Sequence, residues 1–151
     1  MLNIENLNNL NFLNNKKVLI IAACSATKLG STSDTKAKAK DMYQGRLFRL
    51  TRKLAEKNNW PYVIISAKYG LLLPDDEIEG YEKFLKNKKD VEEIKPKVIP
   101  KLKEIIKDYD IILGIVGGQY KKVIEELVDD KFIFIKSKGY GDLCSKVEAM
   151  I

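Results

Sequence analysis

Four short stretches of the chain are almost wholly apolar and rich in β-branched residues, a pattern typical of strands buried on both faces of a sheet. Polar or turn-forming residues bound each stretch, and none approaches the ~20 apolar residues that a membrane span needs. The sequence therefore predicts four buried strands and no membrane span. The strands are predicted at residues 17–23, 62–66, 110–116 and 131–136.

Apolar residues between and after these strands recur three and four positions apart, the spacing of an amphipathic helix. The clearest stripe starts at Tyr43 and continues through Leu47 and Leu54. The last stripe follows Asp142, a residue type that caps helix N-termini. Helices are therefore predicted over residues 43–57, 120–128 and 143–151.

A further apolar stripe, from Val91 to Ile105, is interrupted by Pro96 and Pro100. Proline removes a hydrogen bond from a helix interior but suits the first helical position. The pattern therefore predicts a short turn and then a helix that begins near Pro100.

Strands and helices alternate along the chain in the order β-α-β-α-α-β-α-β-α, without internal repeat or linker. This alternation predicts an α/β fold with a parallel sheet and right-handed crossovers. In such sheets ligands bind beyond the carboxyl ends of the strands. A functional site is therefore expected in the segments that follow the four strands.

The first fifteen residues differ in composition, because seven of them are asparagine and Leu7, Leu10 and Leu13 are interspersed. This composition predicts a loosely ordered leader whose leucines lie on the body of the protein. We therefore divide the chain into an Asn-rich leader, residues 1–16, and a single α/β domain, residues 17–151, a usual length for one domain.

The chain of 151 residues contains no histidine. This excludes Ser-His-Asp and Cys-His catalysis and any zinc site with a histidine ligand. Cys24 and Cys144 form no C-x-x-C pair, so we expect no metal site. The N-terminus lacks the features of a secretory signal, and a cytoplasmic protein with reduced thiols is the resulting expectation.

The formal net charge is +6, and all but three of the 27 basic residues are lysine. Lysines spread over the whole chain are typical of an ordinary solvated surface. The arginines are concentrated instead: Arg46, Arg49 and Arg52 lie within seven residues, followed by Lys53. Arg46, Arg49 and Lys53 fall within about 60° on a helical wheel, which indicates either a phosphate-binding face or a solvated one.

The segment after the first strand, residues 24–33, is rich in hydroxyl groups and contains Lys28 and Gly30. Hydroxyl and backbone N–H groups hold anions, and Lys28 adds positive charge. The P-loop motif is absent, so the alternative is a plain polar connection. Cys24, beside Lys28, is also a candidate nucleophile, although a buried strand-end cysteine explains it as well.

The second strand ends in Ser66-Ala67-Lys68-Tyr69-Gly70, followed by an apolar run and by Asp75 and Asp76. Lys68 is placed to contact a ligand, and Gly70 permits a close backbone approach. Asp75 or Asp76 is a candidate general base, with Lys68 stabilising developing negative charge. At least one of the two aspartates is equally explained as a helix cap.

The third strand runs into Gly117-Gly118-Gln119, and the fourth into residues 137–142, which contain Lys138 and Gly139. Glycines at a strand-to-helix turn bring backbone N–H groups toward a ligand. The G-x-G-x-x-G fingerprint is missing, so no dinucleotide cofactor is expected. The four strand ends together predict a pocket for a phosphate- or nucleotide-sized anion.

Three stretches make the sequence resemble a known domain family of unknown function: Cys24-Ser25-x-x-Lys28, residues 41–48, and the segment from Ser66 to Tyr81. More loosely, the last stretch is similar to the peroxide-stress YaaA family, which is associated with DNA binding. Cys24-Ser25-x-x-Lys28 is similar to an accessory domain of archaeal tRNA-guanine transglycosylase and archaeosine synthase.

The resemblance implies a uracil-DNA-glycosylase-like fold, a three-layer sandwich around a four-stranded parallel sheet. It covers residues 17–82 well and the rest only by element order. This chain lacks the Gly-Gln-Asp-Pro-Tyr stretch and the late histidine of uracil-DNA glycosylases, so that activity does not follow.

Three functional hypotheses remain. The first is a nucleic-acid- or nucleotide-binding domain, in which Lys28 and Arg46 bind phosphate and Tyr69 or Tyr81 stacks a base. The second is a small nucleosidase, transglycosylase or phosphohydrolase with Asp75 or Asp76 as base. The third is a partner-dependent module whose strand-end cleft is filled by Tyr69, Tyr81 or Leu71. The predicted ligand-binding residues are Cys24, Ser25, Lys28, Tyr43, Arg46, Ser66, Lys68, Tyr69, Gly70, Tyr81, Gly117, Gly118 and Gln119.

Overall fold

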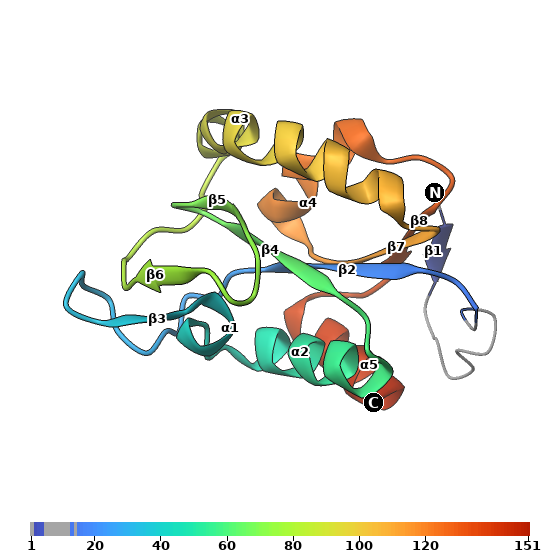
Figure 1. Ribbon diagram of the computed structural model, residues 1–151, viewed down its shortest axis with the longest axis horizontal. Coiled ribbons are helices and arrows are strands. Elements are labelled where there is room, and N and C mark those ends of the chain that lie inside the picture. Colours follow the sequence, from blue (N-terminus) through green and yellow to red (C-terminus); the bar gives the residue numbers. More distant parts are fainter. Residues whose placement is uncertain (1, 5–12, 14) are drawn as a thin grey trace.

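The computed structural model describes residues 2–4, 13 and 15–151, which form a mixed α/β fold around one central sheet (Figure 1). The described strands of this sheet stand in the order β1-β8-β7-β2-β4-β5. The first five in this order pair in parallel, and β5 pairs antiparallel with β4. Their bounds are β1 Leu2–Ile4, β2 Val18–Ala23, β4 Tyr62–Ser66, β5 Gly70–Leu72, β7 Ile111–Ile115 and β8 Phe132–Ile135.

The four predicted strands are confirmed as the parallel centre of the sheet, but the expected total of four is wrong. The two missed strands, β1 and β5, have three residues each, too few to show a periodic pattern. Residues of β1 belong to the predicted leader, where they pair with β8, and Leu13 is buried in the core. Leu7 and Leu10 lie outside the described residues.

Helices cover both faces of the sheet (Figure 1). The helices α2 (Arg46–Asn58) and α5 (Tyr140–Met150) pack on one face, and α3 (Lys88–Ile105) and α4 (Gly118–Ile124) on the other. Alternate residues of β2 serve the two faces, because Ile20 joins one core cluster and Ile21 the other. Both clusters are buried, which explains why the strand is apolar throughout. Shorter helical turns are α1 (Ala39–Met42), η2 (Ile106–Asp108) and η3 (Glu125–Leu127).

Four helix predictions need correction. No turn separates the two prolines of α3: Pro96 and Pro100 both lie inside the helix. Both prolines are exposed, and the buried stripe of α3 includes Val98 and Leu102. Packing of that stripe on the sheet therefore outweighs the backbone hydrogen bonds that proline removes. 

The predicted helix over residues 120–128 is α4 followed by the separate turn η3, and the first predicted helix starts at Arg46 rather than Tyr43. Gly139, not Asp142, is the N-cap of α5. The Asp142 carboxylate instead accepts the Lys138 N–H at 2.7 Å, because it lies in the first turn of the helix.

A small antiparallel sheet flanks the carboxyl end of β4. It pairs β3 (Lys36–Lys38) with β6 (Glu77–Glu79). Gly80 follows β6, and a Cβ there would lie 2.3 Å from the Gly30 carbonyl oxygen, so the two loops pack backbone against backbone. In the part of the chain that the structure describes, no helix is long and apolar enough to cross a membrane.

The connections change direction at β2. The chain passes from β2 to its neighbour β4 on one side, and later enters β7 on the other side of β2. In open α/β sheets the crevice at such a reversal, outside the carboxyl ends of the strands, is the usual ligand site. A ligand site is therefore expected at the end of β2 next to β7.

Candidate functional site

A cavity of about 680 Å³ lies at this reversal point, and we call it the switch-point pocket. It opens at the carboxyl ends of β2, β7 and β8, between α2 and α5 on one side and α4 on the other. Cavities of ~300–1,000 Å³ hold small-molecule ligands and cofactors. The lining residues are Ala23, Cys24, Leu47, Val116, Gly117, Gly118, Tyr120, Lys121, Ile135, Lys136, Ser137, Lys138, Gly139, Tyr140 and Leu143.

The described lining of the switch-point pocket is basic. Lys121, Lys136 and Lys138 contribute to it, whereas none of its lining residues is aspartate or glutamate. The nearest part of α5 does carry Asp142, but its carboxylate accepts the Lys138 N–H and forms an ion pair with Lys146 at 3.3 Å. These bonds hold the pKa of Asp142 below its usual range. The lining therefore favours an anionic occupant.

Glycines form two of the turns around the pocket. Gly118 has a φ of 54° and Gly139 a φ of 151°, conformations that L side chains rarely adopt. No atom would contact a Cβ at Gly117, Gly118 or Gly139, so the backbone there is open to an occupant. No side chain caps the N-terminus of α5, whose first N–H groups have no partner within the helix. These N–H groups and the positive end of the helix dipole add to the attraction for an anion.

Cys24 forms the floor of the pocket together with Tyr120. The Cys24 thiol donates a hydrogen bond to the Tyr120 hydroxyl over 3.3 Å. Burial, followed by the proximity of Cys24, raises the pKa of Tyr120 well above its usual value. The hydroxyl of Tyr120 is therefore neutral at physiological pH and serves as a fixed polar group on the floor.

A smaller cavity of about 240 Å³ adjoins the switch-point pocket and shares Ala23, Cys24, Leu47 and Tyr140 with it. The predicted ligand residue Ser25 lines this cavity, but its hydroxyl is already engaged. It donates to the Thr27 carbonyl at 2.7 Å and accepts the Gly45 N–H at 3.1 Å. Ser25 thus joins the strand-end loop to the start of α2.

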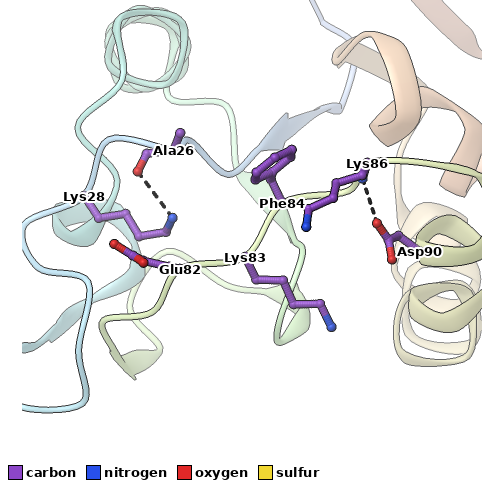
Figure 2. Close-up of a pocket in the computed structure, with 7 residues that line it drawn as sticks. All are labelled: Ala26, Lys28, Glu82, Lys83, Phe84, Lys86 and Asp90. Carbon is purple, nitrogen blue, oxygen red and sulfur yellow. Dashed lines mark hydrogen bonds between the residues drawn. The ribbon is translucent and has the colours of Figure 1, made fainter.

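Lys28 points into a third cavity, of about 400 Å³, which we call the Phe84 pocket (Figure 2). The Lys28 ammonium lies 4.4 Å from the centre of the Tyr81 ring, a cation–π contact. Burial lowers the pKa of Lys28, and the neighbouring Cys24 and Glu82 oppose that shift. The described lining consists of Ala26, Lys28, Glu82, Lys83, Phe84, Lys86 and Asp90.

The end of β4 is filled rather than hollow. The hydroxyls of Tyr43 and Tyr81 lie 2.7 Å apart, and Ser66 Oγ lies within hydrogen-bond distance of both. Ser66 Oγ also accepts the N–H groups of Lys68 and Tyr69. The Tyr81 ring is 5% exposed, so its faces are not open for a base to stack, contrary to our hypothesis for that residue.

Lys68 and Tyr69 lie in the turn after β4, Gly70 is the first residue of β5, and none of them lines the three cavities. The Tyr69 hydroxyl bonds to the backbone of Glu79, and the Lys68 ammonium lies 5.2 Å from the Tyr69 ring centre. At Gly70 a Cβ would lie 2.5 Å from Lys97 Cβ. Gly70 therefore serves the packing of β5 against α3, whereas Tyr69 joins the turn to β6.

The candidate bases lie away from the three cavities. Asp75 is on the surface, 3.0 Å from the Lys40 ammonium and 3.7 Å from that of Lys38, and these lysines lower the pKa of Asp75. The Asp76 carboxylate accepts the Leu73 N–H at 2.8 Å and stabilises a turn before β6. No helix follows, so neither aspartate is a helix cap.

The arginines are not gathered on one ligand. Arg46 pairs with Glu148 at 3.1 Å, and Arg52 with Asp41 at 3.0 Å and Glu56 at 2.7 Å. These pairs connect α2 to α5 and to α1. Arg46 is therefore a partner of α5 beside the switch-point pocket, not part of its lining.

Gln119, another predicted ligand residue, donates weakly from its amide to the Lys86 carbonyl at 3.5 Å. Its side-chain oxygen is buried and has no hydrogen-bond partner among the described residues. Two exposed aromatic residues, Phe84 and Tyr140, were not among the predicted ligand-binding residues. The glycine and lysine signal in residues 137–142 does point to Tyr140, but no sequence signal marks Phe84.

A family model described as a family of unknown function, DUF6884, matches residues 18–140, and the chain belongs to this family. No curated protein matches the sequence. The fold is similar to the crystal structure of AF0587, a protein of unknown function, with a TM-score of 0.53 and 17% sequence identity over 89% of this chain. The match spans 44% of that structure. The YaaA, transglycosylase and uracil-DNA-glycosylase resemblances stay predictions.

Proposed function

We propose that this member of the DUF6884 family binds a phosphate-bearing ligand of nucleotide size in the switch-point pocket. One observation carries the proposal: the cavity at the reversal of the sheet has three lysines and no carboxylate among its described lining residues. Lysine supplies a point charge for phosphate, and glycine-flanked backbone N–H groups supply hydrogen bonds.

In this proposal each part of the ligand has a partner in the lining. Lys121 and Lys138 provide positive charge, and the backbone at Gly117–Gly118 and Gly139 approaches the phosphate closely. The ring of Tyr140 offers a stacking surface for a base, because it is 60% exposed while its hydroxyl accepts the Leu47 N–H at 3.2 Å. Cys24 and Tyr120 bound the floor.

We confine the proposed function to binding. The carboxylates that we considered as bases, Asp75 and Asp76, line none of the three cavities at the strand ends. Lys68 does not line them either. Asp76 lines a separate cavity of about 540 Å³, but its carboxylate already accepts the Leu73 N–H there, and we propose no nucleosidase or phosphohydrolase reaction with these residues.

Isothermal titration calorimetry with inorganic phosphate and with nucleoside mono-, di- and triphosphates tests the proposal. We expect a nucleotide to bind, with affinity that falls as salt rises. The double substitution Lys121→Ala/Lys138→Ala should weaken binding about tenfold or more, because each lost charge contact costs on the order of 1 kcal/mol. The matched control is Lys16→Ala/Lys103→Ala, which removes two exposed lysines outside the pocket. Wild-type affinity in the pocket variant, or no binding at low salt, would refute the proposal.

A further inference from the structure

Two aromatic side chains are exposed at the carboxyl edge of the sheet. Phe84 is 55% and Tyr140 60% exposed, and each lines a cavity there. The Tyr140 hydroxyl accepts the Leu47 N–H, and the residue after Phe84, Leu85, is buried in the core and anchors the backbone there. An aromatic side chain has only two rotatable bonds, so little entropy is lost when a flat partner stacks on it.

The cavities beneath these rings adjoin one another. The small cavity at Cys24 shares four residues with the switch-point pocket and shares Ala26 with the Phe84 pocket. Tyr140 therefore lies where the switch-point pocket meets the small cavity, and Phe84 lines the cavity on the other side of Ala26. Figure 2 shows the Phe84 ring between Ala26 and Lys86.

Lysines line the cavities along this edge. The Phe84 pocket contains Lys28, Lys83 and Lys86, and the Lys86 ammonium lies 5.4 Å from the centre of the Phe84 ring. Two carboxylates oppose these lysines. The carboxylate of Asp90 accepts the Lys86 N–H at 2.8 Å, whereas Glu82 lies beside Lys28 (Figure 2). With the three lysines of the switch-point pocket, the edge as a whole stays basic.

We propose that a single strand of nucleic acid lies along this edge, with one nucleotide in the switch-point pocket and bases stacked on Tyr140 and on Phe84. This inference rests on the proposed function and extends it from a free nucleotide to a polymer. Lysines that track a backbone and aromatic rings that stack bases are the two components of single-strand binding. Paired bases in a duplex do not offer their faces to these rings, and an acidic peptide offers no series of flat bases.

Fluorescence anisotropy tests the inference with a labelled oligothymidylate and an oligouridylate of about ten nucleotides. A duplex of equal length and a polyglutamate peptide are the competitors. Phe84→Ala should weaken oligonucleotide binding about 5- to 150-fold, the usual effect of losing one stacked base, and should leave mononucleotide binding unchanged. Leu73→Ala removes an exposed apolar side chain outside the three cavities and is the matched control. 

Glu82→Gln should change binding in the opposite direction. It removes a negative charge beside Lys28, so oligonucleotide affinity should rise and the dependence on salt should steepen. 

The possible failures are distinguishable. If the mononucleotide binds but Phe84→Ala leaves oligonucleotide affinity unchanged, no base stacks on Phe84. The inference is then refuted, and the proposed function stands. If duplex or polyglutamate competes as well as the single strand, the inference is likewise refuted. If neither nucleotide nor oligonucleotide binds, both proposals fall.

Discussion

At the scale of single residues, Gly70 and Gly118 are both glycines that follow a strand, but their surroundings differ. Both have a positive φ, 83° and 54°. At Gly70 the absent side chain leaves room for α3, since a Cβ would lie 2.5 Å from Lys97 Cβ and 2.8 Å from its carbonyl oxygen. At Gly118 no atom lies within 4 Å of the Cβ position, and the space belongs to the switch-point pocket. The first glycine is needed for packing, and the second is needed only for its backbone conformation beside the pocket.

Gly70→Ala should lower the free energy of unfolding by about 2–5 kcal/mol, because it combines backbone strain with a steric clash. Gly118→Ala should cost about 1–2 kcal/mol, from backbone strain alone. Urea denaturation of both variants measures the difference. Equal losses of stability would contradict the assignment of the two glycines to different roles.

At the scale of elements, α3 forms although its interior contains two prolines, because tertiary packing stabilises it. Its N-terminus is well capped, because the Asn87 side chain accepts the Asp90 N–H at 3.1 Å and the Asp90 carboxylate accepts the Lys86 N–H. Downstream, each interior proline leaves one carbonyl of the preceding turn without its helical partner. The buried stripe on the sheet compensates, so the helix continues to Ile105.

Pro96→Ala should therefore stabilise the protein, by about 1 kcal/mol or more, because alanine restores a hydrogen bond and favours the helix. Pro96 is exposed, so the substitution leaves the core intact. The melting temperature should rise. Glu93→Ala, at another exposed position of α3, is the control and should change stability by less than about 0.5 kcal/mol. A lower melting temperature for Pro96→Ala would show that the proline ring itself supports the fold.

At the scale of the whole molecule, part of the response to pH comes from tyrosines that are largely buried. The chain has no histidine, so no imidazole titrates near neutral pH. Burial is the largest cause of a raised pKa at Tyr43, Tyr62, Tyr81 and Tyr120, to about 12 at Tyr62. The response of the fold to pH therefore includes an alkaline component.

Stability should fall as pH rises from about 10 to 12. Over that range the unfolded chain loses phenolic protons, with an ordinary tyrosine pKa near 10, while the folded protein retains them, so deprotonation favours unfolding. Urea denaturation at a series of pH values measures the loss. In Tyr62→Phe the loss should be smaller, and stability at pH 7 should not suffer, because the Tyr62 hydroxyl is buried without a hydrogen-bond partner in the described structure. An identical alkaline slope in this variant would contradict the expectation.

Much of the fold was predictable, because apolar runs and helical spacing are local patterns of the sequence. The apolar runs predicted the four central strands, and the spacing of Leu47 and Leu54 predicted a helix that the structure confirms from Arg46. The glycines after β7 and β8 do lie at a cavity. In contrast, the segment with the most specific resemblance, around Ser66 and Tyr81, forms a buried network instead of an open site.

By itself the sequence determined that this protein has a parallel α/β core and which edge of the sheet carries the glycine- and lysine-containing loops, since strand burial and helix periodicity are local properties. Only the tertiary structure decided which loops enclose a cavity. The order β8-β7-β2-β4 opens a crevice beside β2, while Tyr43 and Tyr81 close the end of β4. Strand order and side-chain filling depend on contacts between residues far apart in the chain, which no local pattern records.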